Sequence, residues 1–268
     1  MTATTEKKPP AHAAPRPKGI AALKPHTTTL MVVGGVLTLL GSFLPWATFV
    51  LNKGPYPAQA TLQNFTAPLA SSTPGYADQS ALLGHDQAKA AAVLDAAGWL
   101  PGPDGVRVKD GRPLRIELTW FNNAGSNKPT LELLQQQVRR VGIDLQLRER
   151  PISDASVIQQ SGEFDALWGN LTRADPDILR SSYSSKGANT YRFPASPLDD
   201  LLAEQAAQSD EDQRSATVAK ILTNLTENYL TIPVVELTTT LGVAANVHGL
   251  KYDASSRIQL YDTWKSQA

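Results

Sequence analysis

The sequence predicts an α/β fold, and three consecutive segments carry that prediction. Residues 114–120 alternate apolar and polar side chains, which is the pattern of a half-buried strand. Residues 129–141 repeat apolar side chains every three or four positions, as a helix with one buried face does, and Gly142 ends this helix. Residues 143–147 alternate again. A strand, a helix and a strand joined by short turns predict a βαβ unit with parallel strands and a right-handed crossover.

The overall composition is that of a globular protein and argues against several kinds of chemistry. Of the 268 residues, 41% are apolar and 19% are charged, which is enough apolar material for a core. The sequence has no cysteine, so we expect no disulfide framework, no thiolate metal site and no cysteine nucleophile. Its four histidines include no pair at the spacing of metal ligands. We therefore expect no metal site and no cofactor.

The first 51 residues predict a tail followed by a membrane anchor. Residues 1–28 are rich in Pro, Ala, Lys and Thr, which predicts a disordered basic tail. A transmembrane anchor is predicted over residues 29–51, because residues 30–51 lack charged side chains and would form a helix of roughly 30 Å, the thickness of a bilayer's hydrocarbon core. More Lys and Arg residues precede this segment than directly follow it, which places the tail in the cytoplasm. We expect a single-pass protein of the cell membrane with its C-terminal domain extracytoplasmic.

Two other interpretations of the apolar segment remain open. It is a signal peptide if Ala58-Gln59-Ala60 is a cleavage site, and it is a core helix if the folded domain buries it. The charge distribution favours a membrane segment, since residues 1–60 carry six basic and one acidic side chain, a net +5, whereas the remaining 19 basic and 24 acidic side chains give −5. This division is typical of a basic membrane flank, so we expect no nucleic-acid partner.

The remaining elements follow from turn signals and periodicity. Residues 52–84 are rich in Pro, Gly, Ser and Thr without any period, which predicts an extended linker or surface segment before a domain at 85–268. Asp86 begins a helix that Gly98 ends, ahead of the βαβ unit. After that unit the sequence predicts a helix near 153–160, a strand at 164–170, helices at 175–182, 197–207 and 211–228, and a last strong strand at 231–237.

Four segments of this domain carry recognisable motifs. They are AAAVLDAAGWLPGPDGVRVKDGRPLRIELTW, LLQQQVRRVGIDLQLRE, GEFDALWGNLTRADPDILRSSYSS and SPLDDLLAEQAAQSDEDQRSATVAKILTNLTENYLTIPVVEL. In this order they resemble the family 5 extracellular solute-binding proteins of ABC transporters, the peptide- and nickel-binding type. The resemblance is to the C-terminal part of such a protein, and the chain has about half of the family's length.

This resemblance implies one lobe of a two-lobed, type II periplasmic-binding-protein-like fold that closes on a ligand. The portion that builds most of the opposing lobe is missing, so the implied function is an incomplete solute-binding component of an ABC importer. Its implied partners are the permease subunits and a peptide or other small polar solute. The alternative is a membrane-anchored interaction module, or a truncated gene product, that does not trap a ligand. We do not expect an enzyme, because no Ser-His-Asp arrangement, phosphate-binding glycine loop or metal cluster is visible.

The resemblance also places a ligand cleft at the loop after the 114–120 strand and at the turn after the 164–170 strand. Ligands of α/β proteins lie beyond the carboxyl ends of parallel strands, which agrees with this placement. The amide-rich first loop suits either a polar ligand or ordinary turn chemistry. The candidate ligand-binding residues are Phe121, Asn122, Asn123, Trp168, Asn170, Thr172 and Arg173.

The second turn leaves several interpretations open. Trp168 either stacks on a ligand or belongs to the core, and Arg173 either pairs with a ligand carboxylate or is solvated. Thr172 stands where peptide-binding members of the family carry an aspartate that holds the ligand's α-ammonium group. A neutral hydroxyl cannot replace that carboxylate, so an anionic or neutral solute fits as well as a peptide. Residues 175–177, Asp-Pro-Asp, are interpreted as a helix start in which the helix dipole favours the aspartates.

Overall fold

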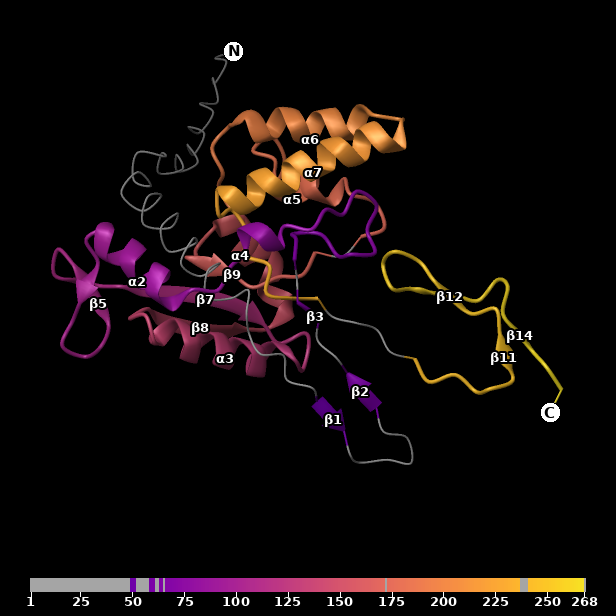
Figure 1. Ribbon diagram of the computed structural model, residues 1–268, viewed down its shortest axis with the longest axis horizontal. Helices are drawn as coiled ribbons and strands as arrows, with labels where there is room; N and C mark the ends of the chain where they lie inside the picture. The colour runs from indigo at the N-terminus through magenta and orange to yellow at the C-terminus, as the bar shows by residue number, and fades with distance from the viewer. Residues whose placement is uncertain are drawn as a thin grey trace, which may run out of the picture.

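The predicted βαβ unit is confirmed in the computed structural model of the chain (Figure 1). The structure describes residues 66–171, 173–236 and 241–267, together with the backbone of three short strands between residues 49 and 64. Strand β7 (Arg115–Phe121) pairs in parallel with β8 (Asp144–Arg150) on one side and with β9 (Ala166–Leu167) on the other. The sheet order β8-β7-β9 therefore puts the carboxyl end of β7 at the centre of one edge.

The two helices that connect these strands lie on opposite faces of the sheet. Helix α3 (Asn127–Arg139) joins β7 to β8, whereas the 3-10 turn η3 (Ile152–Asp154) and helix α4 (Ala155–Ser161) join β8 to β9. Since β8 and β9 flank β7, right-handed crossovers in the two directions require opposite faces. The predicted helix start at Pro129 is two residues late, because proline is tolerated within a first turn, whose N–H groups have no partner in the helix.

A helix and a small meander lie beside this sheet. Helix α2 (Gln87–Ala96) begins as predicted at Asp86, whose carboxylate accepts a hydrogen bond of 2.9 Å from the Lys89 backbone N–H. The chain then forms an antiparallel meander of β4 (Leu100–Pro101), β5 (Arg107–Lys109) and β6 (Arg112–Pro113). Side chains of α2, β7 and α3 together form the first core cluster, which includes Leu94, Ile116 and Leu131.

Arg107 is only 6% exposed. It forms hydrogen bonds with three neighbouring segments, which are helix α2, the turn before β4 and the turn before β8. Its Nε donates to the backbone O of Val141 at 2.7 Å, and its Nη1 donates to the backbone O of Trp99 at 2.6 Å and to the Asp95 carboxylate. The backbone N–H of Arg107 donates to the backbone O of Gly142 at 2.8 Å. Residues 97–99 (A-G-W), 104–107 (D-G-V-R) and 141–143 (V-G-I) are thus parts of one hydrogen-bonded junction.

A second core cluster lies under three further helices. These are α5 (Ile178–Tyr183), α6 (Pro197–Ala207) and α7 (Glu211–Glu227), and the predictions for α6 and α7 agree with the structure to within one residue. Their buried side chains pack with Ala67 and Leu69, which come from the segment predicted as an extended linker. That segment therefore contributes to the core, and residues 66–236 are called the body below.

Asp199 fastens the loop before α6 to the first turn of that helix. Its carboxylate accepts hydrogen bonds from Ser184 Oγ (2.9 Å), Ser185 Oγ (2.7 Å) and the backbone N–H groups of Ser185 (2.8 Å) and Ser196 (3.2 Å). Ser196 and Asp199 form a capping box. Burial alone would raise the pKa of Asp199, but these hydrogen bonds outweigh it and lower the pKa to about 2.

We expect Asp199→Asn to lower the free energy of unfolding by about 2 kcal/mol at pH 7, because each pKa unit corresponds to about 1.4 kcal/mol. A depressed carboxyl pKa stabilises the fold above the unfolded value, which is 3.8. The difference between the wild type and the variant should therefore shrink as the pH falls from 4 to 2 and vanish below that. Urea titrations across this range measure it. Asp200→Asn is the matched control, because 87% of that side chain is exposed, and an equal effect there would contradict the account.

The remaining described strands are two or three residues long and form antiparallel pairs. Strand β1 (Phe49–Leu51) pairs with β2 (Ala58–Ala60), and β3 (Gln63–Asn64) pairs with β10 (Val235–Glu236), all antiparallel. A 3-10 turn, η2 (Ser80–Leu82), precedes α2. Beyond the body, β11 (Val247–His248) pairs with β14 (Trp264–Lys265), and β12 (Lys251–Tyr252) pairs with β13 (Ile258–Gln259).

The predicted membrane anchor falls almost entirely outside the described residues. Only its last three residues are described, and their backbone forms β1. Within the described part of the chain, none of the helices combines the length and apolar character that a membrane crossing requires. The predicted tail at residues 1–28 also lies outside the described residues.

Candidate functional site

The carboxyl edge of the β8-β7-β9 sheet is organised around Asn127, the first residue of α3. Its side chain is 8% exposed, and its Nδ2 donates to the backbone O of Phe121 and to the side-chain Oδ1 of Asn123, both at 3.0 Å. The backbone N–H of Asn122 donates to the backbone O of Arg150 at 3.3 Å, where β7 and β8 end together. The amide-rich loop is therefore held at the end of the central strand.

Trp168 joins the same group from the neighbouring strand. Its Nε1 donates to Asn127 Oδ1 at 3.2 Å, and its backbone N–H donates to the backbone O of Thr119 at 2.8 Å. The indole is partly buried and packs against the first core cluster. Its ring orientation is thus fixed by a core contact on one side and by an amide on the other, which is what a rigid stacking surface requires.

Four of the predicted residues come together, and two others are exposed farther along the chain. Asn122, Asn123 and Trp168 meet at the edge, where Phe121 contributes its backbone O while the residue itself is only 6% exposed. Asn170 and Arg173 are exposed on the segment leading to α5, and Thr172 lies outside the described residues. The backbone O of Arg173 accepts a hydrogen bond of 3.2 Å from Thr73 Oγ1, which holds this segment against the part of the chain before η2.

Asn127 is the residue of this group that sequence reasoning missed. It belongs to the amide-rich loop, but nothing in the sequence distinguishes it from Asn122 and Asn123. The available signal is positional, because a polar residue at the start of the helix after the central strand points back over the end of that strand. The asparagine that organises the edge is therefore the one that begins α3.

The Asp-Pro-Asp turn has a structural role close to the predicted one. Helix α5 begins directly after it, at Ile178, which confirms the helix start. The aspartates are paired, since Asp175 accepts from Arg214 at 2.6 and 3.2 Å and Asp177 accepts from Arg180 at 2.6 and 2.7 Å. These arginine hydrogen bonds lower the pKa of both carboxyl groups. Ion pairs, in addition to the helix dipole, account for the motif.

The predicted residues line neither of two surface hollows in the described part of the chain. One is lined by Glu117 and residues 162–165 on the α4 side. The other is lined by Gln135, Gln136 and Arg139 of α3 and by residues 143–145 at the start of β8. No group of three or more His, Asp or Glu side chains among the described residues is placed to hold a metal ion. The candidate edge is thus an open face that presents amides, an indole and an arginine.

Comparison with known proteins connects this geometry to a family. The family model described as "Bacterial extracellular solute-binding proteins, family 5 Middle" matches residues 47–191, which is more than half of the chain. This chain belongs to the family 5 bacterial extracellular solute-binding proteins. Proteins of this family act outside the cytoplasm, and the match includes both segments of the candidate edge.

Individual proteins of this kind match the chain over different fractions of its length. The Nickel-binding periplasmic protein of Escherichia coli (strain K12) is 32% identical over 158 residues, which are 56% of this chain and 30% of that protein. NikA from Brucella suis, solved in complex with Fe(III)-EDTA, has a TM-score of 0.66 at 24% identity and covers 88% of this chain and 48% of its own. The oligopeptide-binding protein AppA from Bacillus subtilis, solved in complex with a nonapeptide, has a TM-score of 0.60 at 19% identity.

These likenesses confirm the family and the α/β fold of a type II periplasmic binding protein. AppA covers 89% of this chain and 49% of its own length. The chain therefore spans about half the length of both solved family 5 structures, and less than a third of the E. coli relative.

Proposed function

We propose that this chain is the solute-binding component of an ABC importer and holds a small polar solute at the carboxyl edge of the β8-β7-β9 sheet. The observation that carries the proposal is the family 5 match over residues 47–191. Support comes from the edge itself, where Asn127 fixes the amide loop and the Trp168 ring in one arrangement. Fixed polar groups beside an aromatic surface are typical of solute sites.

The chemistry of the edge favours an anionic or neutral solute. Arg173 is exposed on the segment between β9 and α5, and a guanidinium is the group that pairs best with a carboxylate. The corresponding aspartate of peptide-binding relatives is replaced by Thr172. Relatives of this chain are named for nickel, for an Fe(III)-EDTA complex and for a peptide, so the family accommodates several solutes. We infer that a carboxylate-bearing peptide or chelate fits this edge better than a solute whose ammonium group needs a carboxylate partner.

A second candidate function is an extracytoplasmic interaction module that does not trap a solute. The observation that favours it is the exposure of Asn122, Asn123 and Arg173, together with the two surface hollows, which none of the predicted residues lines. In that case the edge would meet a permease or another chain directly. A solute-binding measurement separates the two functions.

Saturation-transfer NMR on the full chain in detergent tests solute binding. The solutes are a tripeptide and its N-acetylated form. We expect the acetylated peptide to bind at least as well as the free one, because no carboxylate at position 172 holds its amino group. Arg173→Gln should weaken the signal severalfold. Arg115→Gln is the matched control, since Arg115 begins β7 at the opposite edge of the sheet. Equal signals from both variants, or no signal with any solute, would count against the proposal.

We also propose that residues 30–51 tether the body to the outer face of the membrane. The 22-residue apolar stretch and its basic flank support this proposal. The full chain should remain in the membrane pellet after alkaline carbonate extraction, which releases peripheral proteins. A matched variant with Leu39→Arg and Leu40→Arg should be released, because charges at the centre of a span cost several kcal/mol. Release of the unaltered chain would show that this segment does not span.

A further inference from the structure

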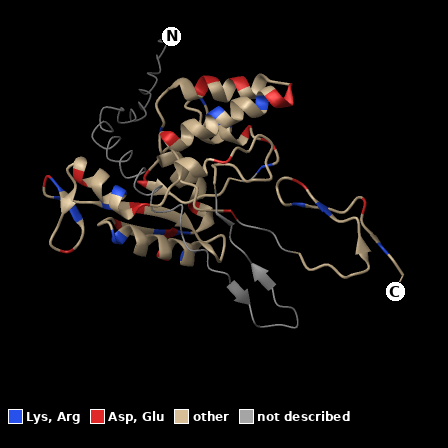
Figure 2. Ribbon diagram, viewed as in Figure 1, with Lys and Arg blue, Asp and Glu red and all other residues tan. Residues whose placement is uncertain are grey.

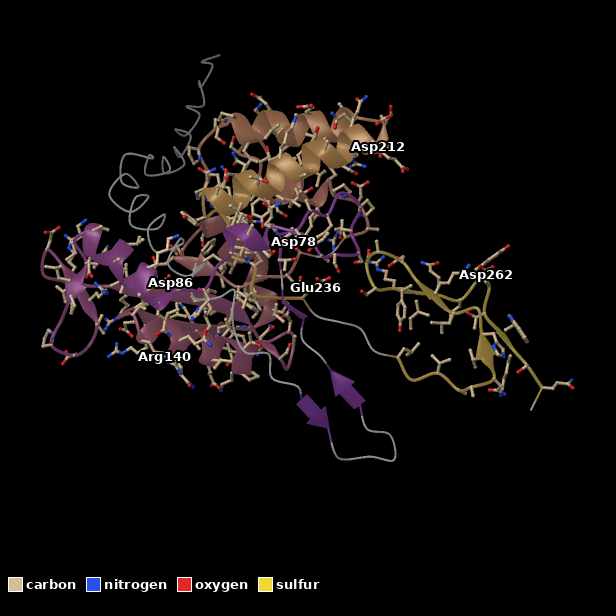
Figure 3. All side chains as sticks on the ribbon, viewed as in Figure 1. Asp78, Asp86, Arg140, Asp212, Glu236 and Asp262 are labelled. Atoms are coloured by element: carbon tan, nitrogen blue, oxygen red, sulfur yellow. The ribbon has the colours of Figure 1, made fainter. Side chains whose placement is uncertain are left out.

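Arg150 is the last residue of β8 and lies at the same sheet edge as the candidate site. Its backbone O accepts the hydrogen bond of 3.3 Å from the Asn122 N–H, and in the parallel register it stands opposite Phe121 of β7. Other arginines lie at the opposite edge of the sheet, where Arg115 begins β7 and Arg140, labelled in Figure 3, follows the end of α3. Arg150 therefore places a cation at the carboxyl edge, next to the amide-rich loop.

The end of β8 carries charges of both signs. Its last three residues are Arg, Glu and Arg, and Figure 2 shows both blue and red on this sheet. Successive side chains of a strand point to opposite faces, so Arg148 and Arg150 share one face and Glu149 lies on the other. Arg148 pairs with Glu117 of β7 at 2.6 Å, and Arg150 pairs with Asp154 of η3 at 2.8 Å. Each of the two arginines thus has one carboxylate partner, but only Arg150 is at the edge.

The ion pair between Arg150 and Asp154 uses only part of the guanidinium. Nη2 of Arg150 donates to Asp154 Oδ2, whereas Nε is buried and has no acceptor among the described residues. Arg180 shows the full arrangement, because its Nε and Nη2 donate to the two carboxylate oxygens of Asp177 at 2.7 and 2.6 Å. Such paired hydrogen bonds are the strong form of an arginine–carboxylate contact. Arg150 therefore keeps donor capacity that Asp154 does not use.

Asp154 is weakly attached apart from this ion pair. Its Oδ1 accepts a hydrogen bond of 3.3 Å from Ser153 Oγ, and its side chain does not cap α4, although it directly precedes that helix. The side chains of Arg150 and Asp154 are 36% and 32% exposed, and ion pairs in contact with water contribute little to stability. A carboxylate on a free solute is not fixed to this backbone. It can accept from both Nε and Nη2 once the guanidinium turns outward.

We propose that Arg150 binds a carboxylate group of the solute, and that this carboxylate displaces Asp154. Asp154 competes with the solute for the same guanidinium, so a neutral group is a poor substitute for it. This inference rests on the proposed solute-binding function and adds a second guanidinium to that of Arg173. Because β8 and β9 flank β7, a solute that reaches Arg150 lies toward the β8 side of the central strand, whereas Arg173 follows β9.

The test compares two probes that differ only at the carboxyl end, which are N-acetyl-trialanine as the free acid and as its C-terminal amide. Saturation-transfer NMR titrations of the full chain in detergent give a Kd for each. The wild type should bind the acid more tightly than the amide. Arg150→Gln should weaken binding of the acid about fivefold and leave the amide unchanged, because only the acid loses a charged partner. Asp154→Asn should strengthen binding of the acid about twofold, because it removes the competitor.

Each of these variants has a matched control. Arg148→Gln removes the arginine on the same strand and face, whose partner is Glu117. Glu149→Gln removes one negative charge beside Arg150, on the opposite face of the strand. Neither control should change the ratio of the two Kd values. All four variants should melt like the wild type. If Arg150→Gln does not, Asp154→Asn decides the matter, because loss of a purely structural ion pair would not strengthen binding.

Three results would overturn the inference while both probes still bind. They are equal binding of the two probes by the wild type, equal effects of Arg150→Gln and Arg148→Gln, and an Asp154→Asn variant that binds the acid no better than the wild type does. In each case the proposed solute-binding function stands. If neither probe binds the wild type at millimolar concentrations, the result counts against the proposed function and overturns this inference with it.

Discussion

Arg107→Ala is expected to lower the free energy of unfolding by about 3 kcal/mol, the largest effect of a single substitution that we predict for this chain. The guanidinium donates to two backbone oxygens, of Val141 and Trp99, and to Asp95. Removing it leaves both carbonyl groups without this donor beside a cavity. Each buried polar group that loses its partner costs about 1–3 kcal/mol.

Urea unfolding followed by tryptophan fluorescence measures this effect. Arg107→Lys separates charge from geometry, because lysine keeps the charge but cannot make the same forked set of hydrogen bonds, so it should recover less than half of the loss. Arg115→Ala is the matched control. Arg115 also pairs with an aspartate, Asp144 at 2.8 Å, but 61% of its side chain is exposed, so its removal should cost no more than about 1 kcal/mol. Similar losses of unfolding free energy in Arg107→Ala and Arg115→Ala would refute the stabilising role of the hydrogen bonds around Arg107.

Solute binding by this chain alone is expected to have a Kd in the millimolar range, about a thousandfold weaker than a micromolar site between two lobes. The edge presents one face, and the exposed Asn122, Asn123 and Arg173 remain in contact with water. Water competes for every hydrogen bond that a solute makes there, and a factor of a thousand corresponds to about 4 kcal/mol.

Isothermal titration of the monomeric full chain with the tripeptides and Fe(III)-EDTA measures this affinity. Submicromolar binding by the monomer would contradict the argument from the open face. Such a result would mean that the described residues already enclose the solute.

The sequence was sufficient where local pattern and packing agree. Strand β7, helix α3 and strand β8 follow from alternation and from a period of three to four residues, and their parallel pairing follows from the short connections. Helix α2 begins after Asp86 and helix α6 begins at residue 197, as predicted. In these elements each residue's local preference and its burial point to the same structure.

The sequence was insufficient where the structure depends on contacts between segments that are far apart in the chain. The strands predicted at 164–170 and 231–237 pair over only two residues each, because strand length depends on a neighbour and not on alternation alone. For the candidate site, the edge itself was predicted, but the central position of Asn127 depends on three contacts from separate elements. Leu69 was assigned to a surface segment, although it is 1% exposed, since turn-rich composition gives no sign of burial.

The pairing of β3 with β10 joins the two ends of the body. Gln63–Asn64 and Val235–Glu236 lie side by side, although more than 170 residues separate them along the chain. The chain therefore enters and leaves the body at one place, held together by backbone hydrogen bonds. A force that pulls the two ends apart must separate β3 from β10 before it loads the helices and strands between them.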